Sequence, residues 1–293
     1  MAATAGTGSD RAIDRIAVGL GCDGRRELGP ECWALCAGTE PRFVLKRRPR
    51  SFTQCESAFR LLQGVSDPDG LLNRPFALES DDSCYYITER FVPGGTDPSR
   101  GRPLMPALFA RLARFHLANR GPGPVRSMYS DGAGFPTVRE MLEAEFAYHE
   151  GFWDLGDRID ECRSRVMELD GGFSTVLHGD VHLGNLVARD GTAVLVDTEW
   201  SLVGLNLFEF EHVDLFDVGR DYPERIRAGA RECCLAYFGE LGIGARRAAE
   251  LMNALGVLKV MRQNTYAKYK RDDAMLAAIP GALEAALAGI ALD

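Results

Sequence analysis

The chain has 293 residues, of which 46% are hydrophobic and 26% are charged, a balance that is ordinary for a folded globular protein. Its formal net charge of −8 argues against a nucleic-acid-binding protein, because such proteins normally carry a basic face. No apolar run approaches the roughly 20 residues that a membrane-spanning helix requires. The length suffices for one large domain or for two lobes that share a cleft.

The N-terminus and the cysteines indicate a cellular compartment. Residues 1–10 are small and polar and lack the basic and apolar regions of a secretory signal peptide. The eight cysteines show no repeated C-x-x-C pair, and the adjacent Cys233 and Cys234 are poorly placed for an ordinary disulfide. In a reducing compartment they behave as small apolar side chains. The sequence therefore predicts a cytoplasmic protein without membrane association, and it leaves a monomer and a homodimer open.

The first ninety residues form short segments that are broken by Gly, Pro and Asp. Residues 11–20 are apolar enough for an opening strand or a short helix. A helix is predicted at residues 51–63, ending before Gly64, because its apolar side chains fall on one side. Strands are predicted around polar turns at residues 31–37, 42–47, 75–79 and 84–91.

After residue 92 the pattern changes from strands to helices. Residues 103–119 carry apolar side chains at helical spacing, and residues 137–169 form a long helical region that is interrupted near Gly151 and Gly156. Helices resume from residue 225 to the C-terminus. Between these helical regions, residues 177–200 contain short apolar strands. The change of pattern near residue 92 predicts a small strand-rich part followed by a larger helical part.

Residues 177–200 are the most informative segment. The runs LHGDVHLGNLV at 177–187 and VLVDTEW at 194–200 place Asp180, Asn185 and Asp197 around two apolar stretches. A carboxylate can orient a hydroxyl and take its proton, and carboxylate and amide oxygens are ligands that magnesium prefers. Each residue alone could be a turn or strand-end residue. Their combination in a strand–loop–strand context favours phosphoryl transfer.

These motifs resemble the catalytic and metal-binding loops of the aminoglycoside phosphotransferase and choline kinase family, relatives of the protein kinases. The resemblance implies an α+β, two-lobed, protein-kinase-like fold. It implies a nucleotide-binding, antiparallel-sheet N-lobe at residues 1–92, and a hinge and mainly helical C-lobe at residues 93–293 with the catalytic loop, metal loop and acceptor site. It further implies ATP and Mg²⁺ as cofactors, Asp180 as the catalytic base, and Asn185 and Asp197 as metal ligands.

The resemblance also implies roles for residues of the N-lobe. Lys46, at the end of an apolar strand, would contact the nucleotide's phosphates, and Glu56 on the next helix would be its carboxylate partner. Backbone groups of Glu89 and Phe91 would pair with adenine at the hinge. Residues 23–30 stand where the phosphate-covering loop is expected, although they lack a G-x-G-x-x-G pattern. The competing interpretation is that residues 46–50 form a solvated basic run.

Other interpretations concern the neighbours of Asp180 and Asp197. His178, Asp180 and His182 could bind zinc or another transition metal in a hydrolase, but Gly179 and Gly184 favour a loop. The family resemblance implies that His178 is a buried structural residue that helps to hold this loop. Glu199 either approaches a second metal or caps the following segment. Asp214–Leu215 resembles a structural D-L step of the family. A pseudokinase scaffold is disfavoured, because it has no physical need for the complete set of acids and asparagine.

The predicted acceptor of the phosphoryl group is a hydroxyl of a small molecule. The first candidate is an aminoglycoside or another antibiotic or amino sugar. A choline-like or homoserine-like metabolic alcohol is the alternative. Acids and aromatic side chains within residues 140–161 could hold a polyamine by charge and cation–π contacts, or could form a solvated helix face. If basic residues near the C-terminus such as Lys259 and Arg262 face the cleft, a phosphorylated or carboxylated acceptor is favoured instead.

Overall fold

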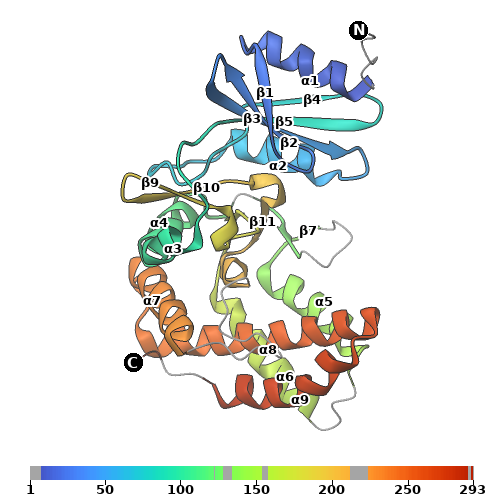
Figure 1. Cartoon of the computed structure of the whole chain (residues 1–293). Coiled ribbons are helices and arrows are strands. Elements are labelled where there is room, and N and C mark those ends of the chain that lie inside the picture. The colour runs from blue at the N-terminus through green and yellow to red at the C-terminus, as the bar shows by residue number, and fades with distance from the viewer. Residues whose placement is uncertain are drawn as a thin grey trace.

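The computed structural model describes residues 8–121, 123–127, 134–153, 158–211, 224–289 and 292. A sheet with two helices forms one part of the molecule, and a larger, mostly helical part lies below it in Figure 1. The predicted α+β class is therefore confirmed. Among the described helices, none is long and apolar enough to cross a membrane.

The first part is built on a five-stranded antiparallel sheet with the order β1-β2-β3-β5-β4. Helix α1 (Gly8–Gly19) packs on one face, and helix α2 (Gln54–Gln63) contacts the other. Because side chains alternate along a strand, Tyr86 faces α1 while Tyr85 and Ile87 face Cys55 of α2. The strands are β1 (Gly24–Gly29), β2 (Cys32–Ala37), β3 (Glu40–Pro49), β4 (Ala77–Ser80) and β5 (Cys84–Arg90).

Two expectations for this part can be compared with the structure. Of the strand and the short helix that residues 11–20 left open, the helix is found, as α1 (Gly8–Gly19). The loop expected at residues 23–30 is largely strand β1, which turns into β2 near Glu31, a residue with positive φ. Strand β1 lies at the sheet edge with mostly exposed side chains, so its sequence lacks the alternation of a half-buried strand.

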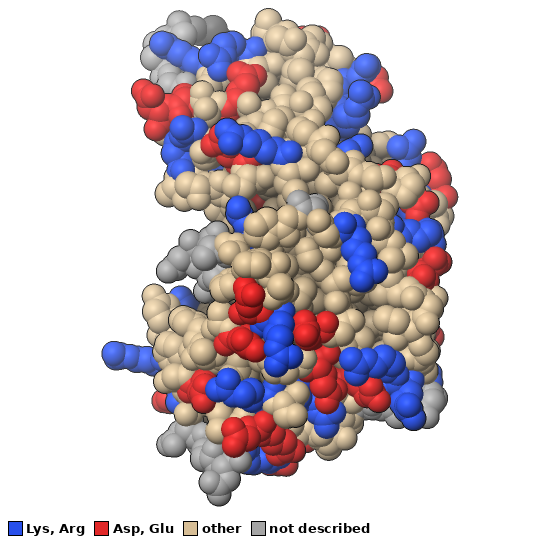
Figure 2. Space-filling model, turned by 180° about the vertical axis from the view of Figure 1, so that it is seen from behind, with Lys and Arg blue, Asp and Glu red and all other residues tan. Residues whose placement is uncertain are grey.

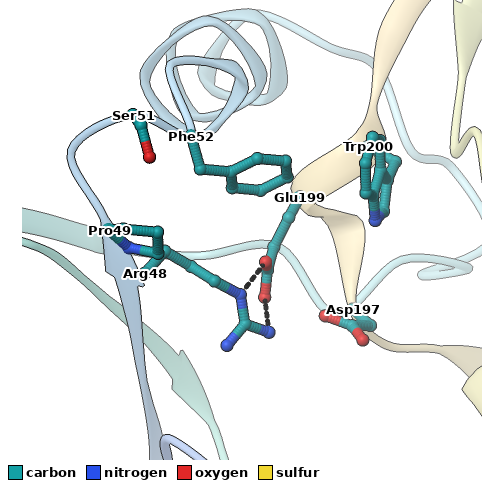
Figure 3. Close-up of a pocket in the computed structure, with 7 residues that line it drawn as sticks. All are labelled: Arg48, Pro49, Ser51, Phe52, Asp197, Glu199 and Trp200. Carbon is teal, nitrogen blue, oxygen red and sulfur yellow. Dashed lines mark hydrogen bonds and ion pairs between the residues drawn. The ribbon is translucent and has the colours of Figure 1, made fainter.

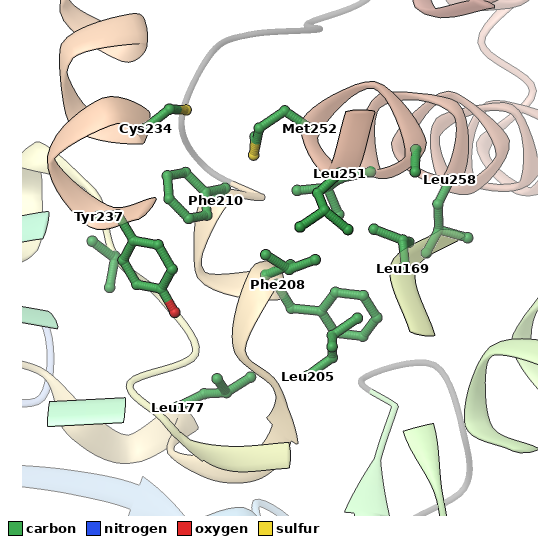
Figure 4. Close-up of a cluster of buried hydrophobic side chains, with 14 of the residues drawn as sticks. Leu169, Leu177, Leu205, Phe208, Phe210, Cys234, Tyr237, Leu251, Met252 and Leu258 are labelled. Carbon is green, nitrogen blue, oxygen red and sulfur yellow. The ribbon is translucent and has the colours of Figure 1, made fainter. Parts of the chain in front are cut away.

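The helices of the second part are α3 (Pro98–Gly101), α4 (Met105–Ala118), α5 (Val138–Glu150), α6 (Ile159–Met167), α7 (Glu224–Glu240), α8 (Ala245–Lys270) and α9 (Asp273–Ala288). All of these except the short α3 contribute apolar side chains to one core. Three strand pairs complete it, namely β6 (Val125–Arg126) with β7 (Gly134–Phe135), β8 (Ser174–Leu177) with β11 (Leu202–Leu205), and β9 (Leu186–Arg189) with β10 (Thr192–Leu195). Figure 4 shows Leu177, Leu205 and Phe208 meeting in this core. The segment that follows β8 therefore begins directly after a residue, Leu177, that is fixed in the core.

Backbone hydrogen bonds connect the two parts beside the end of β10. The Asn73 N–H donates to the Leu195 carbonyl at 2.8 Å, and the Leu195 N–H donates to the Leu71 carbonyl at 2.9 Å. The chain also crosses between the parts through the segment that joins β5 to α3, where the Ala188 N–H donates to the Gly95 carbonyl at 3.2 Å. These contacts fix the sheet relative to the residues that follow β10. The division of the chain at residue 92 stays a prediction.

Candidate active site

The segments after β8 and after β10 are joined by a short set of hydrogen bonds. The Asn185 side-chain amide donates to the Asp180 carbonyl at 3.0 Å and to its carboxylate Oδ2 at 2.8 Å. The Val196 N–H, next to Asp197, donates to the Asn185 carbonyl at 2.9 Å. Because the amide nitrogen of Asn185 points at Asp180, its oxygen is the atom that can ligate a cation. The structure thus joins the loops that carry the three predicted residues.

His178 connects the segment of Asp180 to the segment that precedes Asp197. Its ring is fully buried, and Nε2 lies 2.9 Å from the Val196 carbonyl, so Nε2 carries the hydrogen. Its Nδ1 then accepts the Asp180 N–H at 3.2 Å. Burial lowers the pKa of His178 to about 4, so the ring is neutral near pH 7. With both nitrogens engaged by backbone groups, His178 has the structural role and cannot ligate a transition metal in this arrangement.

Gly179 brings the loop close to the segment after Asp197. Its φ is +84°, and a Cβ atom here would lie 2.4 Å from the Trp200 carbonyl oxygen, so no other residue fits without a shift. The Gly179 N–H donates to Oε1 of Glu209 at 2.8 Å. Glu209 is 2% exposed, and its Oε2 has no hydrogen-bond partner among the described residues. Burial raises the pKa of Glu209 to about 8, so it is largely protonated at pH 7.

No role had been assigned to Glu209 from the sequence. The available signal was its place between Phe208 and Phe210 in the run LFEF, and in the structure this short helical segment buries Glu209 together with both phenylalanines. The D-L step expected at Asp214–Leu215 lies outside the described residues.

Lys46 is the centre of charge on the sheet side. It is 6% exposed, and its Nζ lies 2.9 Å from Oε1 of Glu89 and 2.9 Å from Oδ1 of Asp197. Burial alone would lower the pKa of Lys46, but the surrounding carboxylates outweigh it and raise this pKa above its ordinary value. The lysine is therefore a buried permanent cation, and the alternative of a solvated basic run does not apply to it.

Asp197 has an unusual backbone conformation, with φ 66° and ψ 53°. Such left-handed conformations are costly for residues other than glycine and are concentrated at functional sites. Burial opposes ionisation of its carboxyl group, but Lys46 holds the pKa of Asp197 well below its ordinary value. The carboxylate is therefore ionised and placed to accept a cation.

Glu199 forms an ion pair that the sequence did not suggest. Arg48 donates from Nε to Oε2 at 2.6 Å and from Nη2 to Oε1 at 2.8 Å, so both carboxylate oxygens are used. Figure 3 shows this pair in a pocket of about 470 Å³. The aromatic rings of Phe52 and Trp200 meet edge to face in the same pocket, 5.0 Å apart. Since β3 carries Arg48 and the segment after Asp197 carries Glu199, the pair connects the two parts of the molecule.

The structure does not pair Lys46 with Glu56, the carboxylate partner that the family resemblance implied. The Glu56 side chain is 42% exposed, forms an ion pair with Arg60, and accepts a hydrogen bond from the Tyr85 hydroxyl at 3.4 Å. Helix α2 instead buries the side chain of Cys55. Adjacent positions of a helix point about 100° apart, because one turn holds 3.6 residues, so Glu56 is directed away from the face that carries Cys55. The sequence spacing predicted a helix at the right residues, but the carboxylate that contacts Lys46 is Glu89 of strand β5.

At the expected hinge, one of the backbone groups that were predicted to pair with adenine is engaged within the sheet. The Phe91 N–H, expected to face adenine, donates to the Arg42 carbonyl of β3 at 3.0 Å. Glu89 contributes its side chain, which points to Lys46. The side-chain amide of Asn73 donates to the Arg90 carbonyl at 3.0 Å and to Oε2 of Glu89 at 3.3 Å. Nothing in the sequence around Asn73 had indicated this contact.

The acidic side chains of the helices that were considered for acceptor binding differ in their exposure to solvent. Glu140, Glu143 and Glu161 are exposed, as expected for a solvated helix face. Glu145 of α5 is instead buried against Arg262 of α8, which also donates to Glu211 at 2.8 Å. Arg262 is therefore neutralised by carboxylates, which weakens the prediction that it attracts an anionic acceptor.

Most of the chain matches a model of a phosphotransferase family, and its fold is similar to those of solved phosphotransferases. A model of the phosphotransferase enzyme family matches residues 34–250. The fold is similar to that of an aminoglycoside phosphotransferase from Alicyclobacillus acidocaldarius, with a TM-score of 0.55 and 13% identity over 92% of this chain and 91% of that one. It is also similar to amicoumacin kinase hAmiN in complex with AMP-PNP, Ca²⁺ and Ami, with a TM-score of 0.56 and 13% identity over 95% and 93% of the two chains.

A third similar structure is a thermostable mutant of aminoglycoside phosphotransferase APH(4)-Ia in ternary complex with ADP and hygromycin B, with a TM-score of 0.58 and 14% identity over 90% and 92% of the chains. No curated protein sequence matches the chain. The structural likenesses confirm the two-lobed, protein-kinase-like fold. The family match spans well over half of the chain and confirms the predicted enzyme class, a small-molecule kinase. The chain belongs to the phosphotransferase enzyme family.

Proposed function

We propose that this phosphotransferase uses ATP and Mg²⁺ and transfers the γ-phosphoryl group directly to a hydroxyl of a small molecule. One observation carries the proposal. The buried ammonium group of Lys46 lies 2.9 Å from Asp197, on a segment that is hydrogen-bonded through Val196 to the loop of Asp180 and Asn185. A cation for phosphates, oxygen ligands for a metal and a carboxylate for the acceptor are thus held together.

The donor atoms fit magnesium. Asp197 offers an ionised carboxylate and Asn185 a neutral amide oxygen, and hard divalent cations prefer such oxygen ligands. Asp197 and Asn185 would hold the magnesium ion, which would supply positive charge to neutralise the nucleotide phosphates. Lys46 would then contact the same phosphates with its ammonium group, and its charge is secured by the carboxylates around it. Glu199 lies beside this set, 3.7 Å from the Lys46 ammonium group, and Arg48 holds its carboxylate through both oxygens.

Asp180 has the properties of the base. Its side chain is 24% exposed, so an acceptor hydroxyl can reach it, while Asn185 fixes one carboxylate oxygen. Asp180 would accept the hydroxyl proton as the acceptor oxygen bonds to the γ-phosphorus. The bond from that phosphorus to the bridging oxygen breaks at the same time, and ADP leaves. No phosphoenzyme is formed on this route.

For the acceptor we propose an aminoglycoside or another antibiotic or amino sugar. The net charge of −8 favours a cationic acceptor, and Figure 2 shows acidic and basic side chains intermixed on the face that it presents. Two of the similar structures are complexes of those proteins with gentamicin and with hygromycin B, and a third is an amicoumacin kinase in complex with Ami. A metabolic alcohol is the second candidate.

All eight cysteines are free thiols, which supports a reducing, cytoplasmic location.

A mass-spectrometric screen tests the proposal. Purified protein is incubated with Mg-ATP and a panel of aminoglycosides, peptide and nucleoside antibiotics, amino sugars, choline and homoserine. We expect one acceptor class to gain a single phosphoryl group, and we expect Asp180→Ala to abolish the product while leaving ATP affinity largely intact, since the base contacts the acceptor. Turnover that persists in Asp180→Ala would refute the assignment of the base.

A further inference from the structure

The carboxylate that orients the phosphate-binding lysine comes from an unexpected element. We infer that Glu89 of strand β5 is the positioning residue for Lys46, and that helix α2 supplies no charged partner. The inference rests on the proposed function of Lys46 as a phosphate contact. It assigns the second half of the ion pair to a residue that was expected to act only through its backbone at the hinge.

Sheet register places the two side chains together. In the antiparallel pair of β3 and β5, Lys46 lies opposite Ile87, and Val44 lies opposite Glu89. Lys46 and Glu89 therefore project from the same face as diagonal neighbours, which long side chains can bridge. Their Nζ–Oε1 distance is 2.9 Å, and their side chains are 7% and 2% exposed. Two strands in the interior of the sheet hold both residues, so the pair needs no movement of a helix to form.

Helix α2 offers a thiol where a carboxylate would be needed. Cys55 is 2% exposed and packs against Tyr85 and Ile87 on the same face of the sheet. Burial, with the nearby charge of Glu199, raises the pKa of this thiol to about 12, so it is neutral at pH 7. Glu56 points away from the site and forms an ion pair with Arg60.

A second carboxylate on Lys46 matters because Asp197 has another task. When Asp197 ligates a metal ion, its attraction for the lysine is shared with that ion. Glu89 is buried and stays with Lys46, so the ammonium group keeps a charged partner and a fixed direction. The other oxygen of Glu89 accepts a hydrogen bond from Asn73, whose own N–H binds the Leu195 carbonyl at the end of β10. Glu89 is therefore anchored to both parts of the molecule.

Two double-mutant cycles test the ion pair without nucleotide. Urea unfolding is measured for Lys46→Met, Glu89→Gln and their combination, and in parallel for Lys46→Met, Glu56→Gln and their combination. We expect the Lys46–Glu89 coupling to change the unfolding equilibrium constant by about tenfold or more, as for other buried, directly contacting pairs. We expect the Lys46–Glu56 coupling to be absent. A coupling to Glu56 and none to Glu89 would overturn the inference.

Calorimetry with Mg-ATP and no acceptor then separates positioning from folding. Glu89→Gln is expected to weaken nucleotide binding by about tenfold, the scale of one charge-assisted contact, while Glu56→Gln binds as wild type. Unchanged affinity in Glu89→Gln would overturn the positioning role even if the pair couples in stability. If Glu89→Gln does not fold, Glu89→Asp and Glu56→Asp are measured in place of the two glutamine variants. An unchanged affinity of Glu89→Asp for Mg-ATP would then also overturn the positioning role. If Lys46 and Glu89 are coupled in stability but the wild-type protein binds no nucleotide, the ion pair is confirmed and the proposed function is refuted.

Discussion

Replacing Glu209 by glutamine should stabilise the protein increasingly as the pH rises. Glu209 holds the loop of the catalytic segment through the Gly179 N–H at 2.8 Å. A glutamine side chain has the same shape and keeps the accepting oxygen. It removes only the ionisation, which the buried position resists.

The size of this pH-dependent change in stability follows from the difference between the pKa of Glu209 in the folded protein and its pKa in the unfolded chain. The pKa of Glu209 rises from 4.5 to about 8 on folding, because burial disfavours the charged form. The folded protein therefore binds the proton more tightly than the unfolded chain, and stability falls as the pH rises between these two values. Linkage over the interval from pH 6 to pH 8 gives a loss of about 2 kcal/mol in the wild type that glutamine does not share.

Urea denaturation at pH 6, 7 and 8 measures this effect, with tryptophan fluorescence as the signal. The stability of Glu209→Gln relative to the wild type should increase by about 2 kcal/mol across the series. Comparing the two proteins at each pH cancels the titration of all other groups. A difference that does not change with pH would show that Glu209 is ionised in the folded protein and would refute the reasoning.

Two further predictions concern the same loop and its surroundings. Gly179→Ala should lower Tm and turnover more than Gly191→Ala, because both positions have positive φ but only the first places a Cβ 2.4 Å from the Trp200 carbonyl oxygen; equal effects would contradict the contact argument. His116 is buried, and burial lowers its pKa to about 3, below the unfolded value of 6.5, so the stability that it contributes is lost as the pH falls below 6.5. His116→Asn should therefore gain about 1 kcal/mol relative to the wild type between pH 7 and pH 5.5 in urea titrations, and a constant difference would show that the folded ring protonates normally.

Much of the fold was predictable because local patterns decide it. The helices at residues 105–118 and 138–150 follow apolar spacing, and β2, β3 and β5 follow alternation and turn residues. Asp180, Asn185 and Asp197 were predictable as a group because short loops between strands fix their separation. Strand β1 was missed because it lies at the sheet edge and buries little.

The remaining site residues depend on contacts that sequence spacing does not encode. Glu89 lies 43 positions from Lys46, and only the register of β3 against β5 brings them together. Glu199 and Arg48 are 151 positions apart and meet because the two parts of the molecule pack at this point. Glu56 was a reasonable partner by sequence, but a shift of one helix position exchanges it for Cys55.

The central claim is that Asp197 and its neighbours form a magnesium–nucleotide site. The most direct measurement is calorimetric binding of a non-hydrolysable ATP analogue to the wild type and to Asp197→Ala, each with magnesium and with a chelator. We predict that magnesium strengthens binding to the wild type by at least about tenfold, equivalent to roughly 1.4 kcal/mol, and that Asp197→Ala loses this enhancement. Magnesium-dependent binding of equal strength in both proteins would contradict the account.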